Sequence, residues 1–308
     1  MKVFIIKLTI FFAICLSIIT VVLVNYGGNV DYFYEKFTTP KAKSMIIADS
    51  RGFQGIQPSV IDNYFEGKGY DLPILNFGFT IAQAVIGPLY NKSIFKKLDT
   101  TSNNGIFIIS ITPDMIASRK NYDNKKGEFR EADQPPHNMN FVDINPNYEY
   151  LIKNISFFHF KGMFRKSSTL HKDGWLEETN LPKSEAVYNE WSKNQIAMYL
   201  RDIDNYELSP LRIQSLDTLM KRLSNFGKVF LLRMPISKEF LGYEEYFYPE
   251  FDGIIDSLTK NQNIPYFNFT KIDKIYKTYD GHHLDKYSGK IFTKDLCDLI
   301  ENSLKKQQ

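Results

Sequence analysis

One pattern recurs along the chain: a short, wholly apolar run stops at a turn residue and is followed by a segment with helical spacing. Apolar runs without polar alternation are typical of strands that are buried on both faces, as in parallel sheets. Strands that alternate with helices predict parallel pairing through right-handed crossovers. The expected strands are Ser44–Ala48, Pro73–Gly78, Gly105–Ile111, Lys228–Arg233 and Pro265–Phe269. We therefore expect an α/β fold whose five-stranded parallel sheet lies between two layers of helices.

Spacing and end signals place the helices that connect these strands. We expect one that begins at Pro58, and others over Ala82–Lys97, Ser209–Phe226, Tyr248–Asn261 and Ser288–Lys305. The alternation is interrupted from about 113 to 208, which we interpret as a long insertion in a single domain over 43–308, partly helical between Lys183 and Leu200. Insertions of this size usually cover a site or bind a partner.

The N-terminal segment from Val3 to Val24 is predominantly apolar, with Lys7 as its one charged residue, and this is the length that a membrane-spanning helix requires, about 20 residues. A signal peptide is the alternative, but Asn25–Asn29 has no small-x-small cleavage pattern. We therefore expect an uncleaved transmembrane helix over 1–25. Because the lysines lie at its N-terminal side, the N-terminus is expected in the cytoplasm and the rest of the chain outside it. Residues 26–42 are expected to form a spacer near the lipid headgroups.

Composition excludes several classes of function. The chain has 38 basic and 35 acidic residues and no long basic block, so a nucleic-acid partner is not expected. Its two cysteines cannot form a disulfide framework or a cysteine-based metal site. His137, His159 and His171 are scattered without the spacing of metal ligands, so we expect no metal.

Polar residues follow three of the expected strands. Ser50 and Gly78 end the first two strands, and the loop Asp280–Leu284 follows the last. Carboxyl ends of parallel strands meet at one edge of a sheet, where ligands bind. A serine becomes a nucleophile when an imidazole accepts its proton and a carboxylate orients that imidazole. We therefore predict Ser50 as nucleophile, His283 as base and Asp280 as its partner, with His282 as a rival base and the amides of Ser50 and Gly78 as oxyanion donors.

Three blocks of this sequence resemble the SGNH, or GDSL-type, hydrolase superfamily. They are Ala48-Asp49-Ser50, Asn76-Phe77-Gly78 and Asp280-Gly281-His282-His283-Leu284, and the resemblance spans Ser44 to Leu299 apart from the insertion. It implies a flavodoxin-like sandwich and serine-dependent ester chemistry that needs no cofactor. It also favours His283 over His282, because the histidine of this family directly precedes the residue that corresponds to Leu284.

The resemblance has two departures. Ala48 stands where the family has glycine. The family's third oxyanion donor is an asparagine after the third strand, and the corresponding Ser110-Ile111-Thr112-Pro113-Asp114 has none. Either Ser110 or Thr112 substitutes for that asparagine, or the oxyanion hole has only the two backbone donors.

The apolar N-terminus and the pair Ser50-Arg51 resemble the cell-envelope branch of the superfamily, which includes the D-alanine transfer protein of teichoic acid loci and exopolysaccharide O-acetylation proteins. This resemblance implies an extracytoplasmic O-acyltransferase or esterase that acts on an envelope polysaccharide, with a membrane-bound O-acyltransferase as partner. The alternative is a catalytically weak protein that binds a polymer or scaffolds such an acyltransferase. Arg51 either binds an anionic substrate group or pairs with a carboxylate, and we favour the pairing.

Overall fold

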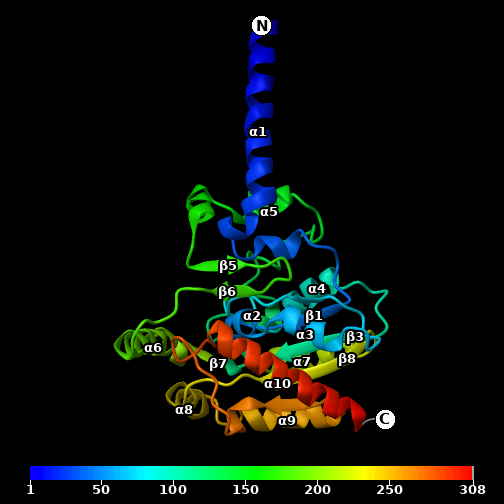
Figure 1. The fold of residues 1–308 in the computed structure, drawn as a ribbon, viewed down its shortest axis with the longest axis vertical. Helices are drawn as coiled ribbons and strands as arrows, with labels where there is room; N and C mark the ends of the chain where they lie inside the picture. Colours follow the sequence, from blue (N-terminus) through cyan, green and yellow to red (C-terminus); the bar gives the residue numbers. More distant parts are fainter. Residues whose placement is uncertain (307–308) are drawn as a thin grey trace.

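The computed structural model describes residues 1–306, and its centre is a parallel sheet (Figure 1). The sheet has the order β2-β1-β3-β8-β9. Its strands are β1 (Ser44–Ile47), β2 (Ile74–Asn76), β3 (Gly105–Ser110), β8 (Gly227–Arg233) and β9 (Tyr266–Asn268). In chain order this is 2-1-3-4-5, the flavodoxin-like arrangement, so the expected five-stranded parallel sheet is confirmed.

Helices cover both faces of this sheet. Side chains of β3 alternate between two cores: Phe107 and Ile109 belong to one, and Ile106 and Ile108 to the other. The first core is covered by α4 (Pro88–Lys97), α7 (Pro210–Leu223) and α9 (Phe251–Asn261), and the second by α3 (Pro58–Phe65) and α10 (Lys286–Lys305). A strand that buries both of its faces needs an unbroken apolar sequence, which is why these runs could be recognised.

Two expected helices begin three or more residues later in the structure than the sequence predicts. The helix expected from Ala82 begins only at Pro88, because proline is favoured in a first turn and has no amide to continue an earlier helix. The helix expected from Tyr248 is α9, which begins at Phe251. A separate helix, α8 (Lys238–Phe247), precedes it and was not expected.

The segment 113–208 has more regular structure than expected. Its strands form two antiparallel pairs, β4 (Ala117–Arg119) with β7 (Tyr206–Leu208), and β5 (Ser168–Leu170) with β6 (Leu176–Glu178). The expected helix near Lys183–Leu200 is confirmed as α6 (Glu185–Leu200). The remaining elements are η2 (Pro113–Ile116), η3 (Asn124–Lys126), α5 (Tyr148–Asn154), η4 (Phe157–Phe164) and η5 (Ile203–Asn205).

The N-terminal helix α1 (Lys2–Val30) projects from the domain and is long and apolar enough to cross a membrane (Figure 1). It ends at Val30 rather than near residue 25. The expectation of a spacer near the headgroups is wrong for η1 (Tyr34–Phe37), because its aromatic side chains are fully buried in the core. Lys36 is buried with them, and its Nζ donates to the carbonyl oxygens of Asn76 (2.5 Å) and Gly174 (2.6 Å). Burial of these rings outweighs what they would gain at a membrane surface.

Candidate active site

Ser50 is the first residue of α2 (Ser50–Gly55), which is separated from the end of β1 by two residues. Asp49 caps this helix, since its side chain accepts a hydrogen bond from the amide of Arg51 (3.0 Å). A Cβ atom on Gly52 would lie 2.4 Å from the Cβ of Ala48, so only glycine lets the helix pack this closely on the strand end. The sharp strand-to-helix turn therefore holds the Ser50 hydroxyl at the carboxyl edge of the sheet, between the neighbouring strands β2 and β3.

The structure brings together Ser50, His283 and Asp280, as the sequence predicts. His283 Nδ1 donates to the Asp280 carboxylate (2.7 Å), which leaves Nε2 as the acceptor of the imidazole. The Ser50 hydroxyl donates to this Nε2 (2.9 Å). These are the contacts that a serine nucleophile, its base and an orienting carboxylate require.

The loop that carries Asp280 and His283 is held by its own hydrogen bonds. Asp280 Oδ1 accepts from the amides of His282 (3.0 Å) and His283 (2.7 Å), and Gly281 has a φ of 79°, which favours glycine. Burial alone would raise the pKa of Asp280, but the His283 imidazole and these amide donors lower it below its usual value. Asp280 therefore remains ionised and keeps His283 in one orientation.

His282 is not placed to act as the base. Its Nε2 accepts a hydrogen bond from Arg51 Nε (2.8 Å), so the proton of the neutral ring lies on Nδ1. Burial, and then the charge of Arg51, lower the pKa of His282 well below its usual value. Its Nδ1 lies 3.2 Å from His283 Nε2 and competes with the Ser50 hydroxyl for the same lone pair. The His282 ring therefore contacts the His283 imidazole but not Ser50.

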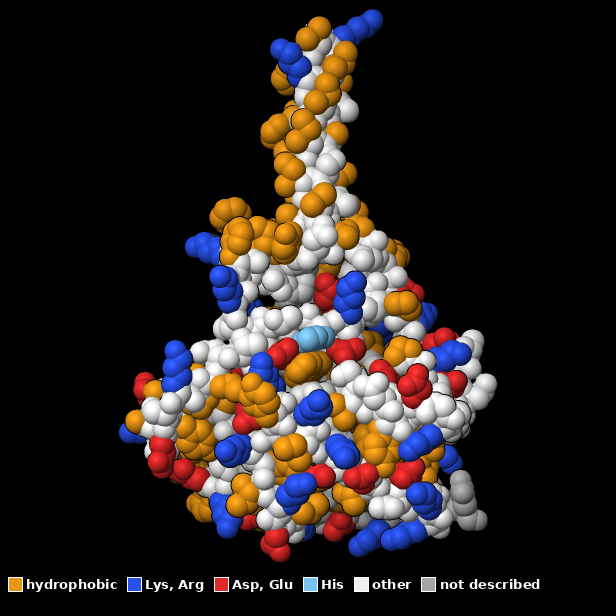
Figure 2. All heavy atoms as spheres, in the orientation of Figure 1, with side chains coloured by type: hydrophobic (Ala, Val, Ile, Leu, Met, Phe, Trp, Pro, Cys, Tyr) orange, Lys and Arg blue, Asp and Glu red, His pale blue; other side chains and the backbone are white. Residues whose placement is uncertain are grey.

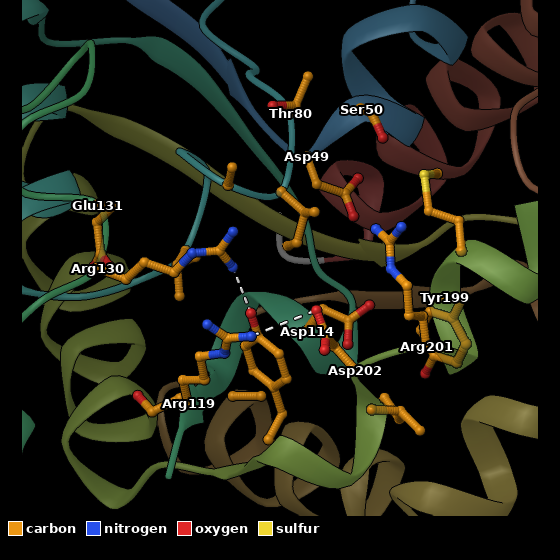
Figure 3. Close-up of a pocket in the computed structure, with 18 of the residues that line it drawn as sticks. Asp49, Ser50, Thr80, Asp114, Arg119, Arg130, Glu131, Tyr199, Arg201 and Asp202 are labelled. Carbon is orange, nitrogen blue, oxygen red and sulfur yellow. Dashed lines mark hydrogen bonds and ion pairs between the residues drawn. The ribbon is translucent and has the colours of Figure 1, made fainter. Parts of the chain in front are cut away.

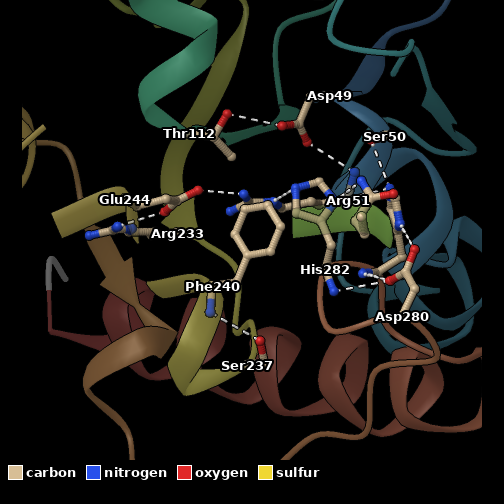
Figure 4. A network of polar contacts seen from close by, with 12 residues as sticks. Asp49, Ser50, Arg51, Thr112, Arg233, Ser237, Phe240, Glu244, Asp280 and His282 are labelled. Atoms are coloured by element: carbon tan, nitrogen blue, oxygen red, sulfur yellow. Dashed lines mark hydrogen bonds and ion pairs between the residues drawn. The ribbon is translucent and has the colours of Figure 1, made fainter. Parts of the chain in front are cut away.

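Arg51 belongs to a buried ion network (Figure 4). Its guanidinium pairs with Glu244 of α8, and the other oxygen of Glu244 accepts from Arg233 Nη2 (2.7 Å). Arg233 Nη1 also pairs with Asp252 (2.8 Å). Although burial opposes ionisation of Glu244, the two arginines lower the pKa of that carboxyl. Arg51 is 1% exposed, and its ion pair with Glu244 confirms the expectation that it pairs with a carboxylate.

The remaining candidate oxyanion donors are engaged elsewhere or lie away from the cavity beside Ser50. The Gly78 amide donates to the side chain of Asn76 (3.0 Å), and the Thr112 hydroxyl donates to Asp49 (2.9 Å). Ser110 is fully buried, and none of Gly78, Ser110 and Thr112 lines that cavity. The Ser50 amide, in the first turn of α2, is of the kind that helix geometry leaves without an internal partner.

Three residues that support the site were not predicted from the sequence. Asn76 Nδ2 donates to the carbonyl oxygens of Gly52 (2.9 Å) and Ile56 (3.1 Å), which ties α2 to the end of β2. The ring of Tyr279 stacks on His283, with centroids 5.6 Å apart. Glu244 holds Arg51. A sequence signal existed only for Asn76, since it lies in the block that contains Gly78.

A cavity of about 490 Å³ opens beside Ser50 (Figure 3). Ser50 and His283 line one part of it, and residues of the insertion line the other. Asp114, which follows β3, also lines this cavity, and burial together with repulsion from Glu244 raises its pKa to about 7. Within residues 1–306, no three His, Cys, Asp or Glu side chains converge in a way that could hold a metal ion.

Comparisons with known proteins return low similarity. No protein-family model matches the chain, and no curated protein matches it. One similar solved structure is Est24, a carbohydrate acetylesterase from Sinorhizobium meliloti, at 11% identity and a TM-score of 0.39, covering 84% of this chain and 98% of that one. Another is the inhibitor-bound aryl esterase of M. smegmatis, at 9% identity and a TM-score of 0.37, covering 84% and 97%. At these values the likeness decides nothing about activity.

Proposed function

We propose that the chain is a serine-dependent esterase or O-acyltransferase that acts on an acylated glycan of the cell envelope. The observation that carries this proposal is the hydrogen-bonded series Ser50–His283–Asp280, with distances of 2.9 Å and 2.7 Å, at the edge of a cavity. Asp280 and His283 lie more than two hundred residues from Ser50 in the sequence, and each contact of the series has the polarity that acyl transfer requires.

The chemistry follows from these contacts. The Ser50 oxygen attacks the ester carbonyl while its proton moves to His283 Nε2. Asp280 stabilises the imidazolium, and the Ser50 amide donates to the developing oxyanion. When the tetrahedral intermediate collapses, the bond to the leaving alkoxide breaks, and that oxygen takes the proton from His283. Water then releases the acyl group in an esterase, or a sugar hydroxyl accepts it in a transferase, and His283 again takes and returns the proton.

The same proposal places the catalytic domain outside the cytoplasm, tethered by α1. The support is the 29-residue length of α1, its apolar composition and its projection from the domain. Lys2 and Lys7 near its free end favour a cytoplasmic N-terminus. A tether of this kind would keep the site beside envelope polymers and beside a membrane-bound O-acyltransferase as partner.

A second candidate function is a catalytically weak protein that binds a polymer or scaffolds such an acyltransferase. It is favoured by the engaged amide of Gly78 and the engaged hydroxyl of Thr112, because they leave the oxyanion with fewer free donors. Loss of one oxyanion donor typically lowers kcat by about 10²–10³-fold. The two candidates differ in whether Ser50 reacts.

Covalent labelling separates these candidates. We expect a fluorophosphonate probe to label the full-length protein in detergent or vesicles, and to leave Ser50→Ala unlabelled. Ser59→Ala is the matched control, because Ser59 is an exposed serine on the neighbouring helix α3. Labelling that persists in Ser50→Ala, or a wild-type protein that stays unlabelled under conditions in which a known serine esterase reacts, would leave the binding or scaffold function instead.

A further inference from the structure

The part of the active-site cavity away from Ser50 is built by the insertion and is rich in arginine (Figure 3). Arg119 at the end of β4, Arg130 in the following loop and Arg201 at the C-terminal end of α6 all line it. Tyr122 and Tyr206 lie in the same wall. Figure 3 shows the guanidinium of Arg201 directed toward the side of the cavity where Asp49 and Ser50 lie.

The carboxylates of this cavity are mostly committed to other partners. Glu131 is buried and pairs with Arg212 (2.9 Å), and Asp202 pairs with Arg119 (3.4 Å). Asp49 accepts from Thr112 and from the Arg51 amide.

Arg130 and Arg201 are therefore the two arginines of this cavity that are not paired with one of its carboxylates. Within residues 1–306, neither has a carboxylate within 4.0 Å. Arg130 instead donates to the hydroxyl of Tyr206. Asp114 is the remaining acidic side chain of the cavity, and its pKa of about 7 leaves it only partly charged near neutral pH.

We propose that Arg130 and Arg201 form a subsite for an anionic group, a carboxylate or a phosphate, on the glycan whose ester reaches Ser50. This inference rests on the proposed esterase or acyltransferase function. Guanidinium groups bind carboxylate and phosphate oxygens with two parallel hydrogen bonds. Arg130 and Arg201 are both exposed, so such a group can reach them from solvent. Tyr122 and Tyr206 supply flat faces beside the arginines on which a sugar ring can pack. The insertion thus selects charged sugars for a reaction centre built by the sheet.

The test compares three acetyl esters that share one ring: an acetylated methyl glucoside, the corresponding methyl glucuronoside, and acetylated glucose 6-phosphate. We expect wild-type kcat/KM to be at least about 10-fold higher for an anionic ester than for the neutral one, and this preference to shrink as salt screens the charges. The carboxylate and phosphate arms show which anion the subsite prefers. The ratio between anionic and neutral esters is the readout, so a general loss of activity does not mimic the effect.

Arg130→Gln and Arg201→Gln should each reduce this ratio several-fold, and the double variant should bring it near one. Arg222→Gln is the matched control, because Arg222 is an exposed arginine of α7 that does not line the cavity. Equal kcat/KM for neutral and anionic esters in the wild type, or a preference that survives both substitutions, overturns the subsite while the esterase function stands. Inactivity toward every ester and toward p-nitrophenyl acetate overturns the proposed function, and the subsite with it.

A second inference comes from the end of the domain that contacts α1. Most side chains from Val3 to Ile18 are exposed, whereas Ile19 packs on the core, Leu23 is buried and Thr20 Oγ1 lies 2.6 Å from the hydroxyl of Tyr148 on α5. The free stretch from Val3 to Ile18 is about 24 Å long at 1.5 Å per residue. A hydrocarbon core is about 30 Å thick, so a bilayer that α1 spans extends past Ile18 to the part of the helix that lies beside the domain, where Val21 and Val24 are still exposed.

The same end of the domain exposes large apolar side chains. Ile152 on α5 and Phe157, Phe158 and Phe164 of η4 are between 72% and 82% exposed. The turn η4 lies against the end of α1, since a Cβ on Gly162 would be 2.7 Å from the Asn29 carbonyl oxygen. Figure 2 shows apolar and basic side chains gathered beside the foot of the projecting helix. The basic residues in this part of the sequence are Lys153, Lys161, Arg165 and Lys166.

We infer that these four apolar side chains form a membrane-docking patch, which enters the interface of the bilayer that α1 spans. This inference rests on the proposed tethering by α1. The patch lies beside the part of α1 that a bilayer of this thickness reaches, and the long side chains of the neighbouring cations can extend to the polar headgroup region. Together, the helix α1 and the docking patch fix the orientation of the domain relative to the membrane.

Fluorescence quenching in vesicles tests this patch. In a full-length background carrying Trp175→Phe and Trp191→Phe, we expect Phe158→Trp to be quenched by lipids with a nitroxide near the headgroup end of the acyl chain. Tyr246→Trp is the matched control, because Tyr246 is an exposed aromatic residue on α8, at the opposite end of the domain (Figure 1). Equal quenching of the two tryptophans overturns the patch. Protein that does not float with vesicles overturns the tether itself.

Discussion

Ser50→Ala is expected to lower kcat/KM for p-nitrophenyl acetate by about 10⁶-fold, and His283→Ala by a similar factor. Ser50 supplies the attacking oxygen, and His283 Nε2, 2.9 Å away, is the acceptor for its proton. Without either group the remaining activity comes only from binding and from oxyanion donors. The measurement is initial-rate hydrolysis by the full-length protein, repeated with an oligosaccharide acceptor so that transferred acetyl is distinguished from released acetate.

The double variant gives the sharper result. Because the two residues act as one unit, Ser50→Ala combined with His283→Ala should be no slower than the worse single variant. Ser59→Ala, on the exposed surface of α3, should leave the rate unchanged. Additive losses, or a single variant that keeps more than a tenth of the wild-type rate, would show that the hydrolysis does not pass through this pair.

Glu244→Gln is expected to lower the free energy of unfolding by about 3–5 kcal/mol. Glu244 is fully buried and joins Arg51 to Arg233, so loss of its charge leaves the buried Arg51 guanidinium with a neutral partner, while Arg233 keeps its pair with Asp252. Arg51 Nη1 already lacks a hydrogen-bond partner within the described chain, so the network has little capacity to compensate. Urea unfolding followed by circular dichroism measures the change as a lower midpoint at constant slope.

The neighbouring Glu245 provides the control for this prediction. Glu245 is exposed on the same helix α8, and Glu245→Gln should change stability by no more than about 0.5 kcal/mol. Comparable small losses in both variants would mean that the network contributes little. A Glu244→Gln protein of normal stability with an altered rate would instead point to an effect through Arg51 and His282.

The three candidate site residues could be identified in the sequence because each belongs to a local pattern. Ser50 lies two residues after the end of an apolar run, and Asp280 and His283 share one tight loop. Both patterns are formed by residues that lie within a few positions of one another in the sequence. The role of Gly78 as an oxyanion donor depends on which group its amide faces. In the structure that group is the Asn76 side chain. The oxyanion donors other than the Ser50 amide therefore remain predictions.

The burial of η1 illustrates the opposite case. Tyr34 and Phe37 follow a membrane-length helix, and composition alone fits a headgroup region. In the structure both rings are fully buried, against residues contributed by distant segments such as Phe77 and Tyr150. No property of the local sequence distinguishes an aromatic residue that meets lipid from one that meets the core.

The parallel sheet, the apolar helix α1 and the candidate residues Ser50, Asp280 and His283 could be predicted from the sequence alone, because periodicity and turn chemistry are local properties of the chain. The pairing of Arg51 with Glu244, 193 residues away, and the placement of arginines of the insertion along the cavity beside Ser50 are visible only in the folded chain. Choice of partner for a buried charge depends on which segments pack together, and packing is a property of the whole fold.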